Sequence, residues 1–107
     1  MTQVRLHPQV YLDIDKALGA TRAQFGPEQV RIYERLILDA RKKLAAEPEN
    51  GQKYAELGAD VYLLSIAKAG IDAPYGYIYR AAGDGTVSVV RLVHLERYLP
   101  DLIDKEA

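Results

Sequence analysis

Residues Ala73–Ile103 read APYGYIYRAAGDGTVSVVRLVHLERYLPDLI, and this stretch decides the fold of the chain. Two runs rich in β-branched and aromatic residues, Tyr75–Ala81 and Thr86–His94, flank the tripeptide Gly83–Gly85 (GDG). Glycine and aspartate accommodate the positive φ angles that a tight connection between strands requires, so the stretch predicts an antiparallel hairpin. The second run is apolar on both faces, which is typical of a strand inside a sheet rather than at its edge.

Upstream of the hairpin, apolar residues recur at the spacing of helices. The first helix is expected over about Pro8–Gln24. The second begins at Pro27, where the missing N–H of proline costs nothing in the first turn, and ends before the turn sequence Pro48–Gly51. The apolar stripes of the two helices are Val10, Ile14, Ala17 and Leu18, then Val30, Tyr33, Ile37, Ala40 and Leu44.

The remaining strand-like segments complete an α+β domain. Strands are expected at Val4–Leu6, Tyr54–Leu57 and Val61–Lys68, in addition to the two strands of the hairpin. The predicted fold is an N-terminal short strand and a helical hairpin packed on a mostly antiparallel four- to five-stranded sheet. A short C-terminal helix or tail follows at Leu99–Ile103. Residues 1–107 are expected to form one domain. The sheet face away from the helices should stay partly open, and functional residues are expected there or at a strand end.

Composition excludes several classes of function. The chain has 107 residues, of which 49% are hydrophobic and 27% charged, and a net charge of −1 argues against a general nucleic-acid binder. With no cysteine, two separated histidines and no Gly-rich phosphate loop, neither a metal nor a cofactor is expected. No apolar run approaches the ~20 residues that span a bilayer, and the N-terminus does not resemble a signal peptide, so a cytoplasmic protein without membrane contact is expected.

The end of the last predicted strand gathers polar side chains of four kinds, from His94, Glu96, Arg97 and Tyr98. Phosphodiester cleavage would need a general base, a general acid and a cation beside the developing phosphate charge. However, Glu96 would repel a phosphate, and His94 and Arg97 lie on opposite sides if the strand continues. The more common role of a histidine at such a position is structural, with a hydrogen bond to a neighbour.

Three tyrosines, Tyr75, Tyr77 and Tyr79, share one side of their strand because side chains alternate. They could form a stacking platform for bases, as in single-strand binders. The alternative, which the burial habits of aromatic residues favour, places them in the core under the helices with their hydroxyl groups at its rim.

Two further sets of charged residues have simple structural interpretations. Arg91 interrupts an apolar strand on the expected face of Val87, Val89 and Val93, so its guanidinium must face solvent, pair with a carboxylate or contact a ligand or partner. The carboxylates of Asp13 and Asp15 are expected on a solvated face of the first helix.

Several segments, in this order, resemble the RelE/ParE superfamily of bacterial toxins from type II toxin–antitoxin pairs. These segments are VRLHP at 4–8, LAAEPENG at 44–51, YGYIYR at 75–80 and VVRLVHLERYLP at 89–100. The resemblance covers most of the chain and implies a small toxin that binds a cognate antitoxin as a possible hetero-oligomer.

The sequence also departs from the pattern of this superfamily. Gly76 stands where an arginine is common. The segment VYLLSIAK has Leu63 or Leu64 and Ser65 where related toxins often have a glutamate and an arginine. The RelE-type ribonucleases depend on several basic residues of the sheet and on a C-terminal tyrosine. The ending of this chain resembles the ParE branch more closely, whose members inhibit DNA gyrase without being hydrolases.

Three hypotheses follow from the resemblance. In the first, the chain is a ParE-like toxin that binds DNA gyrase. In the second, it is a RelE-like enzyme that cleaves messenger RNA on the ribosome. In the third, it is a non-toxic relative that retains only antitoxin binding. The residues expected to recognise the target or antitoxin are Arg80, Arg91, His94, Arg97 and Tyr98, and those of a ribonuclease would be Lys68, Arg91, His94 and Arg97.

Overall fold

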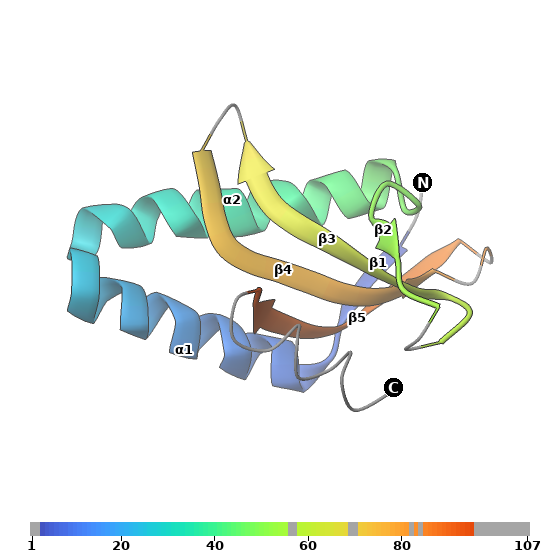
Figure 1. Cartoon of the computed structure of the whole chain (residues 1–107), viewed down its shortest axis with the longest axis horizontal. Coiled ribbons are helices and arrows are strands. Elements are labelled where there is room, and N and C mark those ends of the chain that lie inside the picture. Colours follow the sequence, from blue (N-terminus) through green and yellow to red (C-terminus); the bar gives the residue numbers. More distant parts are fainter. Residues whose placement is uncertain (1–2, 56–57, 69–70, 82, 84, 96–107) are drawn as a thin grey trace.

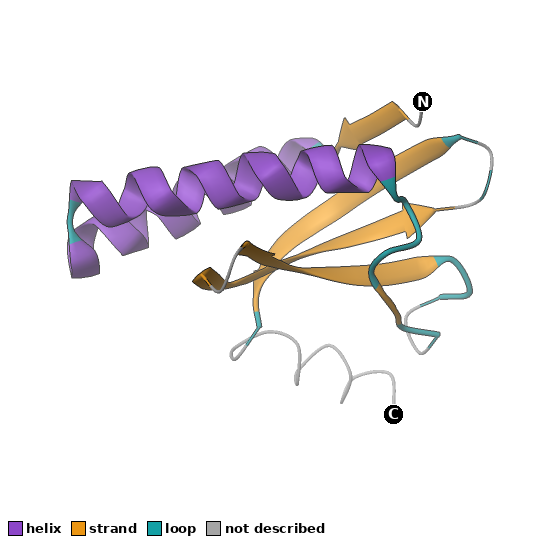
Figure 2. Ribbon diagram, turned by 90° about the horizontal axis from the view of Figure 1, so that it is seen from above, coloured by secondary structure: helices purple, strands orange, loops and turns teal. Residues whose placement is uncertain are grey.

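The computed structural model describes residues 3–55, 58–68, 71–81, 83 and 85–95, with only the backbone of 67–68 and 71–73. In this part of the chain, two helices cover one face of a five-stranded sheet, which confirms the α+β class (Figures 1 and 2). The elements are β1 (Gln3–Leu6), α1 (Pro8–Phe25), α2 (Pro27–Ala46), β2 (Gln52–Lys53), β3 (Val61–Lys68), β4 (Ile71–Ala81) and β5 (Thr86–His94).

The sheet has the strand order β1-β5-β4-β3-β2. β1 runs parallel to β5, and the other neighbouring pairs are antiparallel. Two parallel strands cannot be joined by a tight turn and require a long connection. The chain between β1 and β5 starts with the helical hairpin α1–α2, which covers one face of the sheet. β5 lies inside the sheet between β1 and β4, as its two apolar faces predicted.

The predicted bounds of the strands agree with the structure in two of five cases, and β1 begins only one residue before the expected Val4. β3 and β5 begin and end where expected, whereas β4 begins at Ile71, upstream of the expected Tyr75. The predicted strand Tyr54–Leu57 is wrong at Tyr54 and Ala55, because the strand at this place is β2, Gln52–Lys53, and one last bond follows it, from Tyr54 N–H to the Val61 carbonyl (2.9 Å). Residues 56–57 lie outside the described residues. The chain then turns, with Gly58 N–H donating to the Ala55 carbonyl. The expected helix or tail at 99–103 lies outside the described residues.

The main core lies between the helices and the sheet. The predicted helical stripes are confirmed as buried or half-buried, and Tyr77 and Tyr79 are 1% and 0% exposed. The Tyr77 hydroxyl donates to the Ile37 carbonyl (3.2 Å), and the Tyr79 hydroxyl accepts from Gly51 N–H (3.0 Å). These two tyrosines are therefore core residues with satisfied hydroxyl groups, and not a stacking platform.

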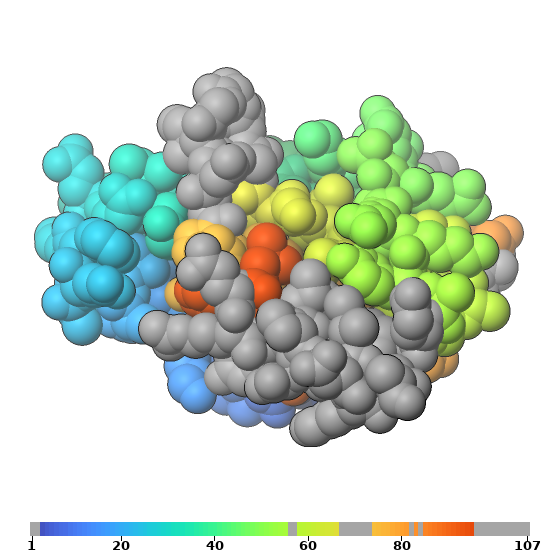
Figure 3. Space-filling model, in the orientation of Figure 1, coloured from blue at the N-terminus to red at the C-terminus, as the bar shows by residue number. Residues whose placement is uncertain are grey.

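The opposite face of the sheet, which we call the second face, also holds buried apolar side chains. These are Val61, Leu63, Ile78 and Val93, with Tyr54, Val90 and Leu95 packed against them. The second face, which was expected to stay partly open, is therefore buried at these positions, while Ser65 and Arg80 on it are exposed. Figure 3 views the molecule from this side, where β3 and the segment that follows α2 reach the surface.

Gly76 lies on the second face, since it alternates along β4 with the buried Tyr77. A Cβ atom at this position would lie 3.0 Å from Leu63 Cδ1, 3.0 Å from Leu95 Cδ2 and 3.2 Å from the Leu64 carbonyl oxygen. Such contacts are tighter than ordinary van der Waals packing. Glycine therefore allows two leucines to close over β4 at the position where the resemblance to the RelE/ParE superfamily would place an arginine.

Candidate functional site

The candidate site forms where β5 loses its neighbour β1. The last bond between these strands is from His7 N–H to the Val89 carbonyl (2.9 Å), after which the chain enters α1. Helix α1 then runs beside the remainder of β5. The Leu92 N–H, which has no strand beside it on this side, donates instead to Asp13 Oδ2 of the helix (3.1 Å).

A β-bulge positions Arg91 at this edge. Ile78 pairs with Arg91 and Tyr79 pairs with Val89, so Val90 is an extra residue on β5. An extra residue shifts the alternation of side chains along its strand. Arg91 therefore does not share a face with Val87 and Val89 as expected, because the bulge lies between them.

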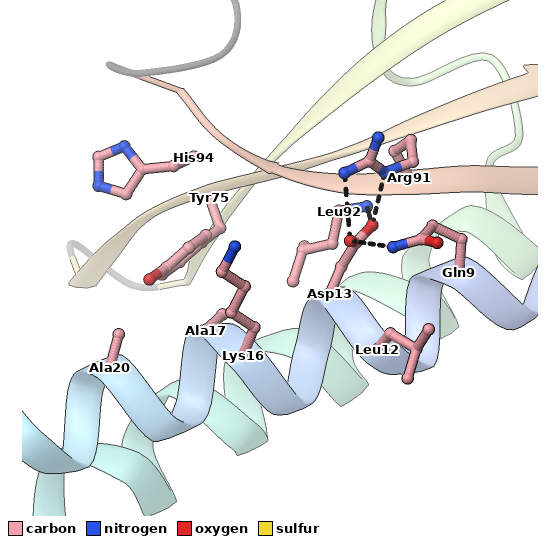
Figure 4. Close-up of a pocket in the computed structure, with 10 residues that line it drawn as sticks. All are labelled: Gln9, Leu12, Asp13, Lys16, Ala17, Ala20, Tyr75, Arg91, Leu92 and His94. Atoms are coloured by element: carbon pink, nitrogen blue, oxygen red, sulfur yellow. Dashed lines mark hydrogen bonds and ion pairs between the residues drawn. The ribbon is translucent and has the colours of Figure 1, made fainter.

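Asp13 and Arg91 form an ion pair with two hydrogen bonds (Figure 4). Arg91 Nε lies 2.8 Å from Asp13 Oδ2 and Arg91 Nη2 lies 3.2 Å from Oδ1, while Gln9 Nε2 also donates to Oδ1 (3.1 Å). The Asp13 side chain is only 8% exposed and that of Arg91 is 48% exposed. Asp13 is therefore not on a solvated face, in contrast to Asp15, which is exposed as expected.

The environment of Asp13 keeps its carboxylate ionised. Burial alone would raise the pKa of Asp13, but the hydrogen bonds from Arg91, Gln9 and Leu92 and the positive charge of Arg91 outweigh this effect. The pKa of Asp13 is consequently lowered from its ordinary value of 3.8.

A pocket of about 210 Å³ opens beside this ion pair. Its walls come from one face of α1, from Tyr75 of β4 and from the end of β5, and its apolar surface includes Leu12, Ala17 and Leu92. Figure 4 shows Lys16 extending from α1 toward the strands, with its ammonium between Tyr75 and Leu92. The pocket therefore combines apolar walls with basic side chains from a helix and a strand.

His94 is held at the pocket by aromatic contacts. Its ring lies edge-on to Tyr75, with 5.3 Å between the ring centroids, and Tyr75 in turn meets Tyr33 edge-on at 6.3 Å. The Nδ1 atom of His94 is buried and has no hydrogen-bond partner in the structure. The expected hydrogen bond is thus missing at Nδ1, and ring packing orients the side chain instead.

The structure brings together only part of the predicted recognition set. Arg91 and His94 both line the pocket. Arg80 is exposed at the far end of β4, opposite Ser88, whereas Tyr75 pairs with His94. At about 3.4 Å per residue, Arg80 lies roughly 17 Å along the strand from the pocket.

Three other predicted residues have limited structural descriptions. Lys68 is the last residue of β3, where its backbone pairs with Ile71 at the same end of the sheet as His94. Arg97 and Tyr98 lie outside the described residues.

Sequence reasoning missed Lys16, which is a basic residue of the pocket. The available signal was its spacing from Asp13, because residues three apart on a helix share a face. That signal required knowing which face of α1 meets the end of β5, and this depends on the tertiary structure.

In the described part of the chain, no three His, Asp or Glu side chains come together as metal ligands would. Among the same residues, no helix is both long enough and apolar enough to cross a membrane.

Comparison with known proteins identifies the family. Residues 4–98 match the family described as the ParE toxin of the type II toxin–antitoxin system parDE. The chain therefore belongs to this family. It is thus a ParE-type toxin, which implies an antitoxin as its partner.

The fold is also similar to a solved structure described as the chromosomal ParDE toxin–antitoxin system from P. aeruginosa. The match has a TM-score of 0.71 at 17% sequence identity, and covers 89% of this chain and 97% of the other. At this identity the likeness shows the fold alone. A comparison with curated protein sequences finds no match.

Proposed function

We propose that this toxin inhibits DNA gyrase by binding to it, without hydrolysing a substrate, and that a cognate antitoxin neutralises the toxin as a hetero-oligomer. Membership of the ParE family supports the toxin–antitoxin part of this proposal. The choice of gyrase rather than messenger RNA depends mainly on one observation, the apolar character of the second face of the sheet.

A ribonuclease must stabilise the negative charge that develops on phosphorus, which requires cations that converge on one point. The centre of the second face instead holds Leu63, Ile78 and Val93, each less than 10% exposed. At Gly76, in the same region, even a Cβ atom would lie 3.0 Å from Leu63 Cδ1 and from Leu95 Cδ2, so any longer side chain requires these leucines to shift. These residues favour a protein-binding function over RNA cleavage on this face.

The basic residues near the end of β5 are also arranged unfavourably for phosphate chemistry. The guanidinium of Arg91 is already bound by Asp13, and Arg80 lies about 17 Å away along β4. An arginine held by a carboxylate remains able to contact a protein through its exposed part. We therefore assign Arg91 and His94, together with Arg97 and Tyr98, to recognition of a protein surface, with Arg80 at its periphery.

A supercoiling assay with purified toxin and DNA gyrase tests this proposal. Inhibition of supercoiling is expected, and prior addition of the antitoxin should restore it. Arg97→Ala should weaken the inhibition, whereas Arg31→Ala, which removes an exposed arginine of α2, should not. Unaltered supercoiling at toxin concentrations well above micromolar would contradict the assignment of gyrase.

Analysis of RNA after induction of the toxin separates the remaining hypotheses. Intact transcripts with arrested growth are expected for a gyrase inhibitor. Cleavage within translated codons would support the ribonuclease, and normal growth without antitoxin would support a non-toxic relative.

A further inference from the structure

We propose that Asp13 is a positioning residue for recognition, which holds the guanidinium of Arg91 in the one orientation that fits the partner. This inference rests on the proposed function, because it takes Arg91 as a residue that contacts gyrase. It adds that the direction of the guanidinium matters as well as its charge, and that a residue of helix α1 sets this direction.

Two hydrogen bonds fix the direction and the tilt of the guanidinium. Arg91 Nε donates to Asp13 Oδ2 (2.8 Å) and Arg91 Nη2 donates to Oδ1 (3.2 Å), so one planar group meets another along two bonds (Figure 4). A single bond would allow the guanidinium to rotate about it. A lysine at this position could not make the paired contact, because its ammonium is a point charge.

The carboxylate that receives these bonds is held independently of the Arg91 side chain. Gln9 Nε2 donates to Asp13 Oδ1 (3.1 Å), and the backbone N–H of Leu92 donates to Oδ2 (3.1 Å). The Asp13 side chain is also only 8% exposed. The position of Asp13 is therefore set by helix α1 and by the backbone of β5, and the guanidinium aligns with it.

The Arg91 side chain remains accessible while it is bound to Asp13. It is 48% exposed, and Asp13 binds it through Nε and Nη2. The β-bulge at Val90 sets the face of β5 from which Arg91 projects, and His94 lines the same pocket. The exposed part of the arginine thus has a fixed place beside a second residue assigned to recognition.

Fixing a side chain before binding increases affinity. A flexible side chain loses conformational freedom when it contacts a partner, and this loss weakens binding. The bonds to Asp13 remove much of that freedom from Arg91 in the unbound toxin. Asp13 also offsets the charge of Arg91, so the contact with the partner depends on directed hydrogen bonds more than on net charge.

A double-mutant cycle with purified toxin and DNA gyrase tests the inference, and the measured quantity is the toxin concentration that half-inhibits supercoiling. Asp13→Asn should raise this concentration about tenfold in the presence of Arg91, but less than about twofold in the background of Arg91→Ala. Asp15→Asn, which removes the same charge from an exposed position of α1, is the matched control and should change the concentration less than about twofold.

Two further measurements distinguish positioning from a purely structural effect. Arg91→Lys keeps the positive charge and leaves the bonds from Gln9 and Leu92 to Asp13 in place, yet it should also raise the half-inhibiting concentration about tenfold. This variant decides the question even if Asp13→Asn does not fold. In NMR relaxation experiments, the Nε–H group of Arg91 should be ordered in wild-type toxin and more mobile in Asp13→Asn, with unchanged backbone order in α1.

The possible results separate this inference from the proposed function. Absence of inhibition by wild-type toxin would overturn the proposed function and this inference with it. If wild-type toxin inhibits gyrase, three results would each overturn the positioning role alone and leave gyrase as the target: no effect of Asp13→Asn, an equal effect of Asp13→Asn in both backgrounds, or full inhibition by Arg91→Lys.

Discussion

Asp13 accepts hydrogen bonds from the guanidinium of Arg91 and from the backbone N–H of Leu92, and so joins helix α1 to the edge of β5. The carboxylate occupies the place that a neighbouring strand would take, since pairing with β1 ends at Val89. One side chain therefore satisfies the open part of β5 and fixes a wall of the pocket. The interaction stabilises the fold and shapes the site at the same time.

Replacing Asp13 by alanine should destabilise the protein by about 1–3 kcal/mol, because it leaves the Leu92 N–H and the Arg91 guanidinium without their acceptor. Chemical denaturation at pH 7 measures this loss. Asp15→Ala, at an exposed position of the same helix, is the control and should change stability by less than about 0.5 kcal/mol.

The pH dependence of stability should reflect the lowered pKa of Asp13. The carboxylate of Asp13 has a lower pKa in the folded protein than the ordinary value of 3.8, which applies to the unfolded chain. Its contribution to the free energy of unfolding is therefore fully present above pH 3.8. This contribution is lost as the pH falls through the lower pKa of the folded state. Denaturation curves of wild type and Asp13→Asn should therefore converge below about pH 4. A constant difference between pH 7 and pH 3 would contradict this account.

Replacing Tyr77 by phenylalanine should cost about 0.5–1.5 kcal/mol at pH 7, through loss of the buried hydrogen bond to the Ile37 carbonyl. Burial raises the pKa of Tyr77 from 10.0 to about 12. Above pH 10 the hydroxyl ionises more readily in the unfolded chain, so wild-type stability should fall between pH 10 and 12. Tyr77→Phe has no hydroxyl to ionise and avoids this loss. The difference in stability between Tyr77→Phe and wild type should therefore be smaller at pH 11 than at pH 7.

Introducing the arginine that is common in related toxins at Gly76 should destabilise the fold by about 1–3 kcal/mol, because Leu63 and Leu95 would have to shift to admit it. Thermal denaturation measures the effect, and Gly76→Ala should lie between wild type and Gly76→Arg. Ser65, the pairing partner of Gly76 on β3, is exposed, so Ser65→Arg is the control and should be tolerated. Full stability of Gly76→Arg would show that the two leucines move apart easily.

Two leucines of α2 should respond differently to truncation. Leu44 is 0% exposed and Leu38 is 52% exposed. Leu44→Ala should therefore cost about 2–5 kcal/mol. Leu38→Ala should cost less than about 0.5 kcal/mol in a denaturation experiment. Similar losses for both variants would indicate that the packing of α2 differs from that described.

The sequence predicted those features of the fold that depend on short-range pattern. The bounds of β3 and β5, the buried stripes of both helices and the central place of β5 follow from periodicity and turn residues. Gly83 and Gly85 both have a positive φ, as predicted for the glycines of the turn between β4 and β5. The strand predicted at Tyr54–Leu57 failed because a short paired segment between turns has too few residues to show a period.

The candidate site could be predicted only in part. His94 and Arg91 were identified from their positions in β5, and both line the pocket. Lys16 was missed, and Arg80 was grouped with residues that lie at the other end of the sheet. Residue type marks a candidate, but the distances between candidates depend on strand register and helix placement.

The amino-acid sequence by itself determined that two amphipathic helices precede a β-meander, because each of these elements is encoded by residues a few positions apart. Only the tertiary structure joined Asp13 to Arg91, which are separated by 78 positions in the chain. It also placed the bulge at Val90, which sets the face of Arg91, and closed two leucines over Gly76. These relationships arise from packing between distant segments, which no local pattern of residues specifies.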